Sequence, residues 1–70
     1  MSELERALLV DYAREVPLHQ TAARLHYSWA YLRRRRFELM QKLGCHTMAK
    51  TVLVAVNEGL LTEETTRDGG

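Results

Sequence analysis

The chain has 70 residues, enough for one small domain but too few for a catalytic cleft beside a hydrophobic core. Its apolar fraction of 46% is ordinary for a folded chain, and one Pro with four Gly argues against disorder over most of its length. The net charge is only +1, yet residues 14–50 hold eight Lys or Arg and two Glu, a net of +6. Positive charge gathered in one region favours a polyanionic partner.

The single cysteine, Cys45, excludes an internal disulfide and is typical of a reducing compartment. A membrane-spanning helix needs about 20 consecutive apolar residues, and no stretch of the chain comes near that length. The first residues show no signal-peptide pattern. We therefore expect a cytoplasmic protein with no membrane partner. Cys45 and the three histidines have no metal-ligand spacing, so we expect a buried Cys45, no metal and no cofactor. No paired carboxylates or nucleophile–base set suggest an enzyme.

The first helix is expected to begin at Ser2, an N-cap, with Glu5 completing a capping box, and to run to about Arg14. Its apolar positions repeat at helical spacing and are expected to be buried: Leu4, Leu8, Leu9 and Tyr12. Pro17 breaks this pattern and can stand at or just before the start of a second amphipathic helix over 18–25.

A three-residue connection separates the second helix from a third. His26 takes the place of the usual turn glycine, so it is expected at positive φ, and Ser28 is the expected N-cap of the third helix. So short a connection forces a steep crossing, with the small Ala22 at the close approach. Three apolar residues are expected to share the core of this unit: Leu25, Tyr27 and Leu32. Residues 18–37 thus fit a helix-turn-helix.

The third helix, expected over 29–43 and ended by Gly44, carries four consecutive arginines. One face is apolar and is expected to pack in the core: Trp29, Leu32, Leu39, Met40 and Leu43. The opposite face is expected to be exposed: Ala30, Arg33, Arg34, Phe37 and Gln41. Arg35 and Arg36 lie on the flanks, where their stems can cover the core. Such a helix has the size and charge to enter the major groove of DNA, although the run alone fits a solvated basic face equally well.

A fourth helix is expected from the N-cap Thr47 to Glu58, stopped by Gly59. Its apolar residues exceed what one neighbour requires, so we expect a homodimer through this helix. The expected dimer residues are Met48, Val52, Leu53, Val54 and Val56. No strand or repeat is indicated, so the predicted fold is all-α, with four helices in a domain over 1–61 and a flexible polar tail over 62–70.

Several strings resemble the LuxR/GerE-type DNA-binding domain of bacterial transcription regulators. They are Glu5-Arg6, Gln20-Thr-Ala-Ala-Arg-Leu25, Ser28, Met40-Gln-Lys-Leu-Gly44 and the closing run 52–61 with Gly59-Leu60-Leu61. The match runs without gaps from residue 1 to 61 and is to the free-standing GerE type, which lacks a receiver or ligand-binding domain. The family usually has Thr-Val at Tyr31-Leu32 and His at Arg35.

The resemblance implies a third helix that enters the major groove and a fourth that pairs in a symmetric dimer. It implies base contacts from Arg33, Arg34 and Phe37, and phosphate contacts from His19, Ser28, Ala30 and Tyr31. Tyr31 can still donate its hydroxyl to a phosphate. Further positive charge for DNA comes from Arg35, Arg36 and Lys42.

The predicted function is that of a sequence-specific transcription regulator that binds double-stranded DNA as a homodimer. RNA polymerase is a further partner that such a regulator could have. Two alternatives stay open. One is a small protein-interaction module that antagonises another regulator through its fourth helix, for which the arginine helix would have no use. The other is a weakly specific architectural DNA binder, because charge dominates the contact helix.

Overall fold

The computed structural model describes residues 1–62, which form four α-helices and no strand. Their bounds are α1 Glu3–Ala13, α2 Leu18–Leu25, α3 Trp29–Lys42 and α4 Met48–Asn57. The predicted all-α, four-helix fold is therefore confirmed, with every helix end within one residue of its predicted place. Of the predicted tail, residues 63–70 lie outside the described part of the chain. None of the four helices has the length and apolarity needed to cross a membrane.

Polar side chains cap three of the helices. Ser2 Oγ accepts a hydrogen bond from the Glu5 N–H at 3.1 Å, and Glu5 Oε1 accepts one from the Ser2 N–H at 2.9 Å, so the predicted capping box is confirmed. Ser28 before α3 and Thr47 before α4 each accept from the N–H three residues on. Pro17 precedes α2 without a side-chain cap.

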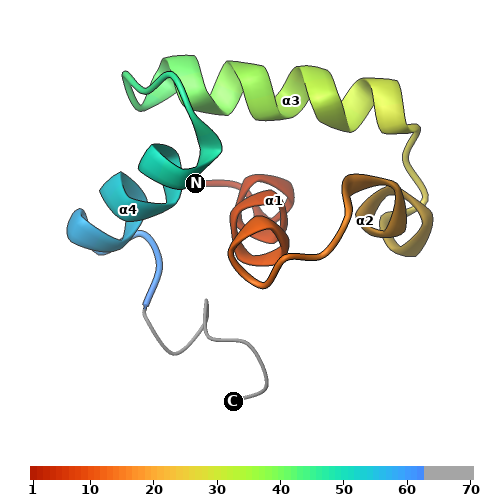
Figure 1. Cartoon of the computed structure of the whole chain (residues 1–70), viewed down its shortest axis with the longest axis horizontal. Coiled ribbons are helices and arrows are strands. Elements are labelled where there is room, and N and C mark those ends of the chain that lie inside the picture. The colour runs from red at the N-terminus through yellow and green to blue at the C-terminus, as the bar shows by residue number, and fades with distance from the viewer. Residues whose placement is uncertain (63–70) are drawn as a thin grey trace.

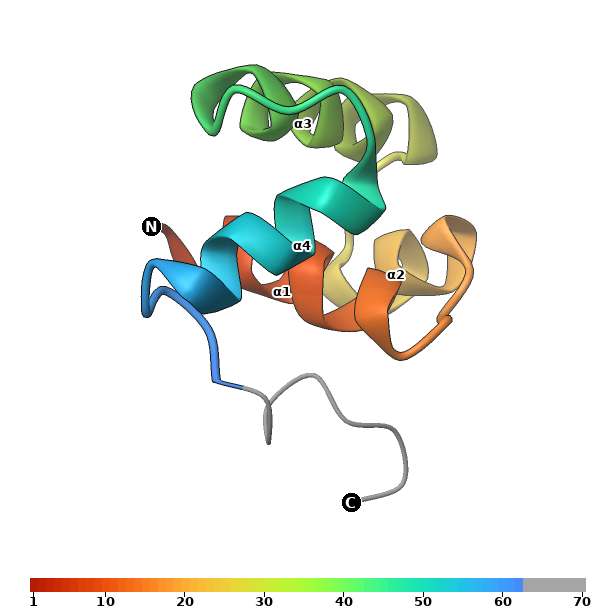
Figure 2. The same cartoon turned by 60° about the vertical axis from the view of Figure 1, so that its left-hand side comes forward.

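The helices α1 and α3 each contact the other three, and α1 lies between α4 and α2 (Figure 1). In that view α3 runs lengthwise, whereas α1 and α2 are seen more nearly end-on, so α3 crosses both steeply. A second view shows α4 passing alongside α1 beneath α3 (Figure 2). Leu8 of α1 packs with Ala22 and Leu32 of the helix-turn-helix. Leu9 faces a second cluster built with α3, α4 and the chain after it: Leu39, Met48, Ala55 and Leu61.

The turn before α3 is left-handed at His26, whose φ is 63° and ψ 37°. This confirms the predicted positive φ in the place of a glycine. The Tyr27 N–H donates to the Ala22 carbonyl at 3.0 Å and closes the turn onto α2. A second non-glycine residue, Glu15 between α1 and α2, also has a positive φ, of 61°, which the sequence did not predict.

A polar cluster between α1 and α2 was not predicted. Asp11 is buried, and its Oδ2 accepts from the Thr21 hydroxyl at 2.6 Å and lies 2.9 Å from Arg24 Nη2. Because a buried carboxylate is costly unless it is paired, these two partners fix α2 against α1. The sequence feature that could have indicated this cluster is Asp11, an acidic residue between Leu8 and Tyr12 on the apolar face of α1.

Three aromatic residues expected in the core are exposed instead: Tyr12 by 36%, Tyr27 by 44% and Trp29 by 48%. Tyr12 lies near the end of α1, Tyr27 in the turn before α3 and Trp29 at the first position of α3. A neighbouring side chain covers each ring in part: Arg36 over Tyr12, Tyr31 against Tyr27 and Arg33 over Trp29. These expectations were wrong because the apolar pattern does not show where the neighbouring helix stops.

Candidate nucleic-acid interface

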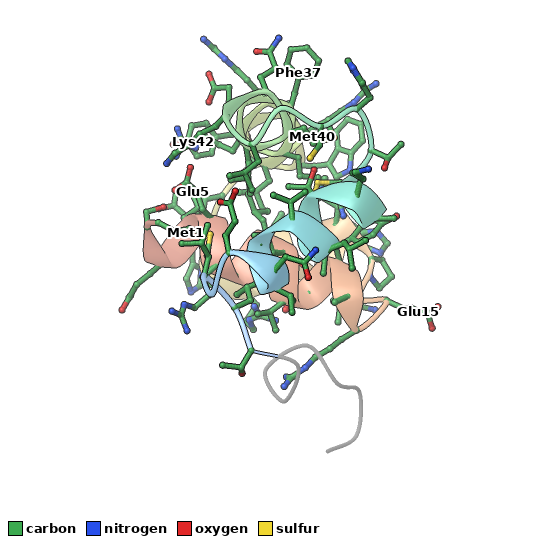
Figure 3. All side chains as sticks on the ribbon, turned by 90° about the vertical axis from the view of Figure 1, so that its left-hand side faces the viewer. Met1, Glu5, Glu15, Phe37, Met40 and Lys42 are labelled. Carbon is green, nitrogen blue, oxygen red and sulfur yellow. The ribbon has the colours of Figure 1, made fainter. Side chains whose placement is uncertain are left out.

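The side of α3 turned away from the other helices carries five exposed residues, which we call the outer face: Ala30, Arg33, Arg34, Phe37 and Gln41. Phe37 is 56% exposed and points away from the other helices, whereas Met40 points back toward them (Figure 3). Leu32 and Leu39 on the opposite side are 0% and 1% exposed. The predicted division of α3 into a buried and an exposed face is therefore confirmed, apart from Trp29.

The two outer arginines keep their charge in solvent. The Arg33 guanidinium carbon lies 5.2 Å from the centre of the Trp29 ring, a cation–π contact along one edge of α3. The Arg34 side chain is 78% exposed, and its Nε lies 3.7 Å from Glu38 Oε2. An exposed pair at this distance contributes little, so it leaves Arg34 free to change partner.

The two flanking arginines are more enclosed. Arg35 Nη1 lies 3.3 Å from Glu38 Oε1, and 31% of its side chain is exposed. The Arg36 guanidinium carbon lies 5.2 Å from the Tyr12 ring centre, so this side chain faces α1. Burial lowers the pKa of Arg36, and the nearby Tyr12 opposes that shift. In both residues Nε is buried without a hydrogen-bond partner. The predicted flank positions of Arg35 and Arg36 are confirmed.

Aromatic residues stand on both edges of the first half of α3. The Tyr27 and Tyr31 rings stack with centres 5.2 Å apart and planes 26° apart. Trp29 and Tyr31 are two residues apart, which sets them about 200° apart around the helix, on opposite edges. The small Ala30 lies between them, so the outer face is low at this point and a second molecule can approach the backbone closely.

The helices α2 and α3 differ from α1 at their first turns. Glu3 and Glu5 occupy the first turn of α1, whereas α2 and α3 have no acidic residue there. The positive ends of the α2 and α3 dipoles are therefore not offset by local acidic charge, which favours an anion near them. His19 and Ser28, two of the predicted phosphate contacts, are exposed at these helix starts.

Lys42 lies at the other end of α3, beside α1. Its Nζ is 3.4 Å from both carboxylate oxygens of Glu5. The Ser2 N–H, followed by Lys42, lowers the pKa of Glu5 against the opposing effect of burial. Lys42, predicted as a DNA contact, is thus engaged in a link between α1 and α3, although its side chain remains 58% exposed.

The fourth helix keeps part of its apolar surface in solvent. Leu53 is 56% exposed, and Val52, Val54 and Val56 are half-buried. Met48, one of the predicted dimer residues, lies in the core of the monomer and is 7% exposed. Cys45 is buried as predicted, and its thiol donates to the Leu43 carbonyl at 3.4 Å. Within residues 1–62, no three His, Cys, Asp or Glu side chains converge as a metal site would require.

No protein-family model, curated protein or solved structure matches this chain. The resemblance to the LuxR/GerE type therefore depends on the strings quoted above. The geometry of this candidate interface comes from four helices whose third exposes two arginines and a phenylalanine on its outer face.

Proposed function

We propose that this chain is a sequence-specific transcription regulator that binds double-stranded DNA through the outer face of α3. The observation that carries the proposal is the exposure of Arg33, Arg34 and Phe37 on the outer face of a helix whose opposite side is anchored in the core. An α-helix fits the major groove, and arginine is the residue that most often reads guanine there.

The outer face offers two kinds of base contact. Arg33 and Arg34 can each donate two hydrogen bonds to the O6 and N7 atoms of a guanine. Phe37 has no donor and can make only apolar contacts, for which the thymine methyl group is the available partner in the major groove. The combination of the two kinds of contact favours a DNA site that contains both guanine and thymine over a site made of one base type.

The starts of α2 and α3 are suited to the phosphate backbone. His19, Ser28 and Tyr31 are exposed there and carry groups that can donate to a phosphate oxygen. Ala30 presents its backbone rather than a side chain, at a helix start without acidic residues. Such contacts fix the register of the helix on DNA without reading sequence.

The exposed apolar side of α4 is proposed to pair with a second copy, which would hold two α3 helices on one side of a homodimer. Of the five predicted dimer residues, Leu53 and Val54 are the ones we expect at this contact, because Met48 fills the core of the monomer and Val52 and Val56 pack partly against it. Half-sites about one turn of DNA apart would then form an inverted repeat. Sedimentation with and without DNA, on the wild type and Leu53→Glu, tests this pairing.

The experiment that tests the proposal is selection of bound duplexes from a random-sequence pool. We expect enriched sequences that form an inverted repeat containing guanine. An Arg33→Ala/Arg34→Ala variant should lose the enrichment, whereas the control Arg14→Ala, an exposed arginine following α1, should keep it. Binding without any enrichment would favour the architectural alternative. No binding in low salt would contradict the proposal and favour the protein-interaction module.

A further inference from the structure

Arg36 belongs to the arginine run but not to the outer face of α3. It is two residues from Arg34, which places the two side chains about 160° apart around the helix. Arg36 is half-buried and lies over the Tyr12 ring of α1. Its role therefore requires a separate account from that of the outer arginines.

A groove opens beside Arg36, between the end of α1, the α1–α2 connection and α4. Its volume is about 570 Å³. Besides Tyr12, Glu15 and Arg36, its lining is apolar: Ala13, Val16, Pro17, Leu18, Ala49 and Val52. We call this cavity the Arg36 groove.

Within the described part of the chain, Arg36 forms no ion pair. Its Nε is buried and lacks a hydrogen-bond partner. The acidic residue of the groove, Glu15, directs its side chain outward, away from the helices (Figure 3). A partly desolvated cation without a carboxylate is costly, so an acidic group that enters from outside would meet an unpaired guanidinium.

We propose that the Arg36 groove is the docking site for an acidic peptide segment of a partner protein. One Asp or Glu of that segment pairs with Arg36, and neighbouring apolar side chains pack against Pro17, Ala49 and Val52. This surface serves protein–protein contact and is separate from the outer face of α3.

The lining favours a peptide over a small molecule. Small-molecule sites fix their ligand with several placed polar groups. Here the charged residues of the lining are Arg36 and Glu15, and Glu15 directs its side chain outward, so Arg36 is left as the charged group for a ligand, beside Tyr12 and apolar residues. Apolar residues together with an arginine and a tyrosine are instead the composition of a protein-interface hot spot. Charge complementarity fixes the sign of the partner residue as acidic.

The test uses the full chain and a displayed library of random short peptides, without DNA. We expect enriched peptides in which an Asp or Glu adjoins apolar residues. A synthetic copy of an enriched peptide should shift the amide NMR signals of Val16, Ala49 and Val52. A second copy with the acid replaced by its amide should bind about tenfold more weakly.

Two variants distinguish peptide binding in the Arg36 groove from a general attraction of acidic peptides to arginine. Arg36→Gln should weaken the peptide about tenfold, whereas Arg34→Gln, which removes an outer arginine, should leave affinity unchanged. If Arg36→Gln fails to fold, Ala49→Gln keeps Arg36 and obstructs the groove from an exposed position of α4, and it should weaken the peptide similarly. The proposal is overturned if no peptide is enriched, if enriched peptides lack an acid, or if binding shifts only the outer face of α3.

Discussion

The arginine run consists of an outer pair, Arg33 and Arg34, and a flanking pair, Arg35 and Arg36. All four are the same residue type, but the two pairs have different surroundings. The outer pair stands in solvent, against Trp29 and Glu38 respectively. The flanking pair has buried Nε atoms, and Arg36 lies over Tyr12 of α1. Because α3 turns about 100° per residue, four adjacent arginines necessarily point in different directions. A run of charged residues within a helix therefore contributes to several surfaces, and each surface needs its own functional assignment.

The largest expected effect is the difference in stability between a substitution on the buried side of α3 and one on its outer side. Leu32 is fully buried, so Leu32→Ala should lower the free energy of unfolding by about 2–5 kcal/mol. Phe37 is 56% exposed, so Phe37→Ala should change it by less than about 0.5 kcal/mol while weakening DNA binding. Thermal unfolding followed by circular dichroism measures the first effect, and a DNA titration the second. Equal loss of stability in the two variants would contradict the two-sided account of α3.

The next effect distinguishes the outer arginines from their neighbour Arg35. Arg33→Ala or Arg34→Ala should cost about 1–3 kcal/mol of DNA binding and relax preference at one base position. Arg35, with only 31% of its side chain exposed, should on mutation to Ala weaken all sequences alike. Competition titrations with single-base variants of a selected site would show the difference. The assignment of faces is wrong if Arg35 discriminates bases better than Arg34.

The angle at which α3 is presented depends on the left-handed turn at His26. Since His26 has a φ of 63°, His26→Gly should be neutral or mildly stabilising. His26→Val should lower the free energy of unfolding by about 1–2 kcal/mol, because a β-branched residue is strained in this conformation. Melting temperatures measure both variants. Similar values for Gly and Val would show that the turn relaxes and does not fix α3.

The smallest expected effect concerns the link from α1 to Lys42 at the end of α3. The lowered pKa of Glu5 means that its carboxylate stabilises the fold fully above the ordinary value of 4.5, and that this stabilisation is lost as the pH falls below it. Glu5→Gln should therefore cost about 1 kcal/mol at neutral pH and much less in acid. The exposed Glu3→Gln is the matched control in urea unfolding at both pH values. A pH-independent cost would mean that packing, not charge, is lost.

Local features of the fold were largely predictable from the sequence. Ser2 with Glu5, Ser28 and Thr47 have the cap chemistry that marks helix starts, and the left-handed His26 followed from the short connection. Each of these depends on a few neighbouring residues, so a single sequence contains the required information.

Features that depend on the relative placement of helices were less predictable. The contacts of Asp11 with Thr21 and Arg24, and of Glu5 with Lys42, join residues that only the packed fold brings together. The exposure of Tyr27 and Trp29 has the same origin, because periodicity does not show where a neighbouring helix stops. Of the candidate site, the direction of Arg34 was predictable, whereas the groove beside Arg36 was not.

The most direct test of the account is the dissociation constant of the wild-type chain for duplex DNA as a function of salt. If the outer face of α3 and the helix starts neutralise about six phosphates, affinity should fall by about three decades between about 50 and 200 mM salt. The Arg33→Ala/Arg34→Ala variant should bind more weakly at every salt concentration, and Arg36→Gln should follow the wild type. Undetectable binding at low salt, or an equal loss in Arg36→Gln and the double variant, would contradict the assignment of DNA binding to the outer face.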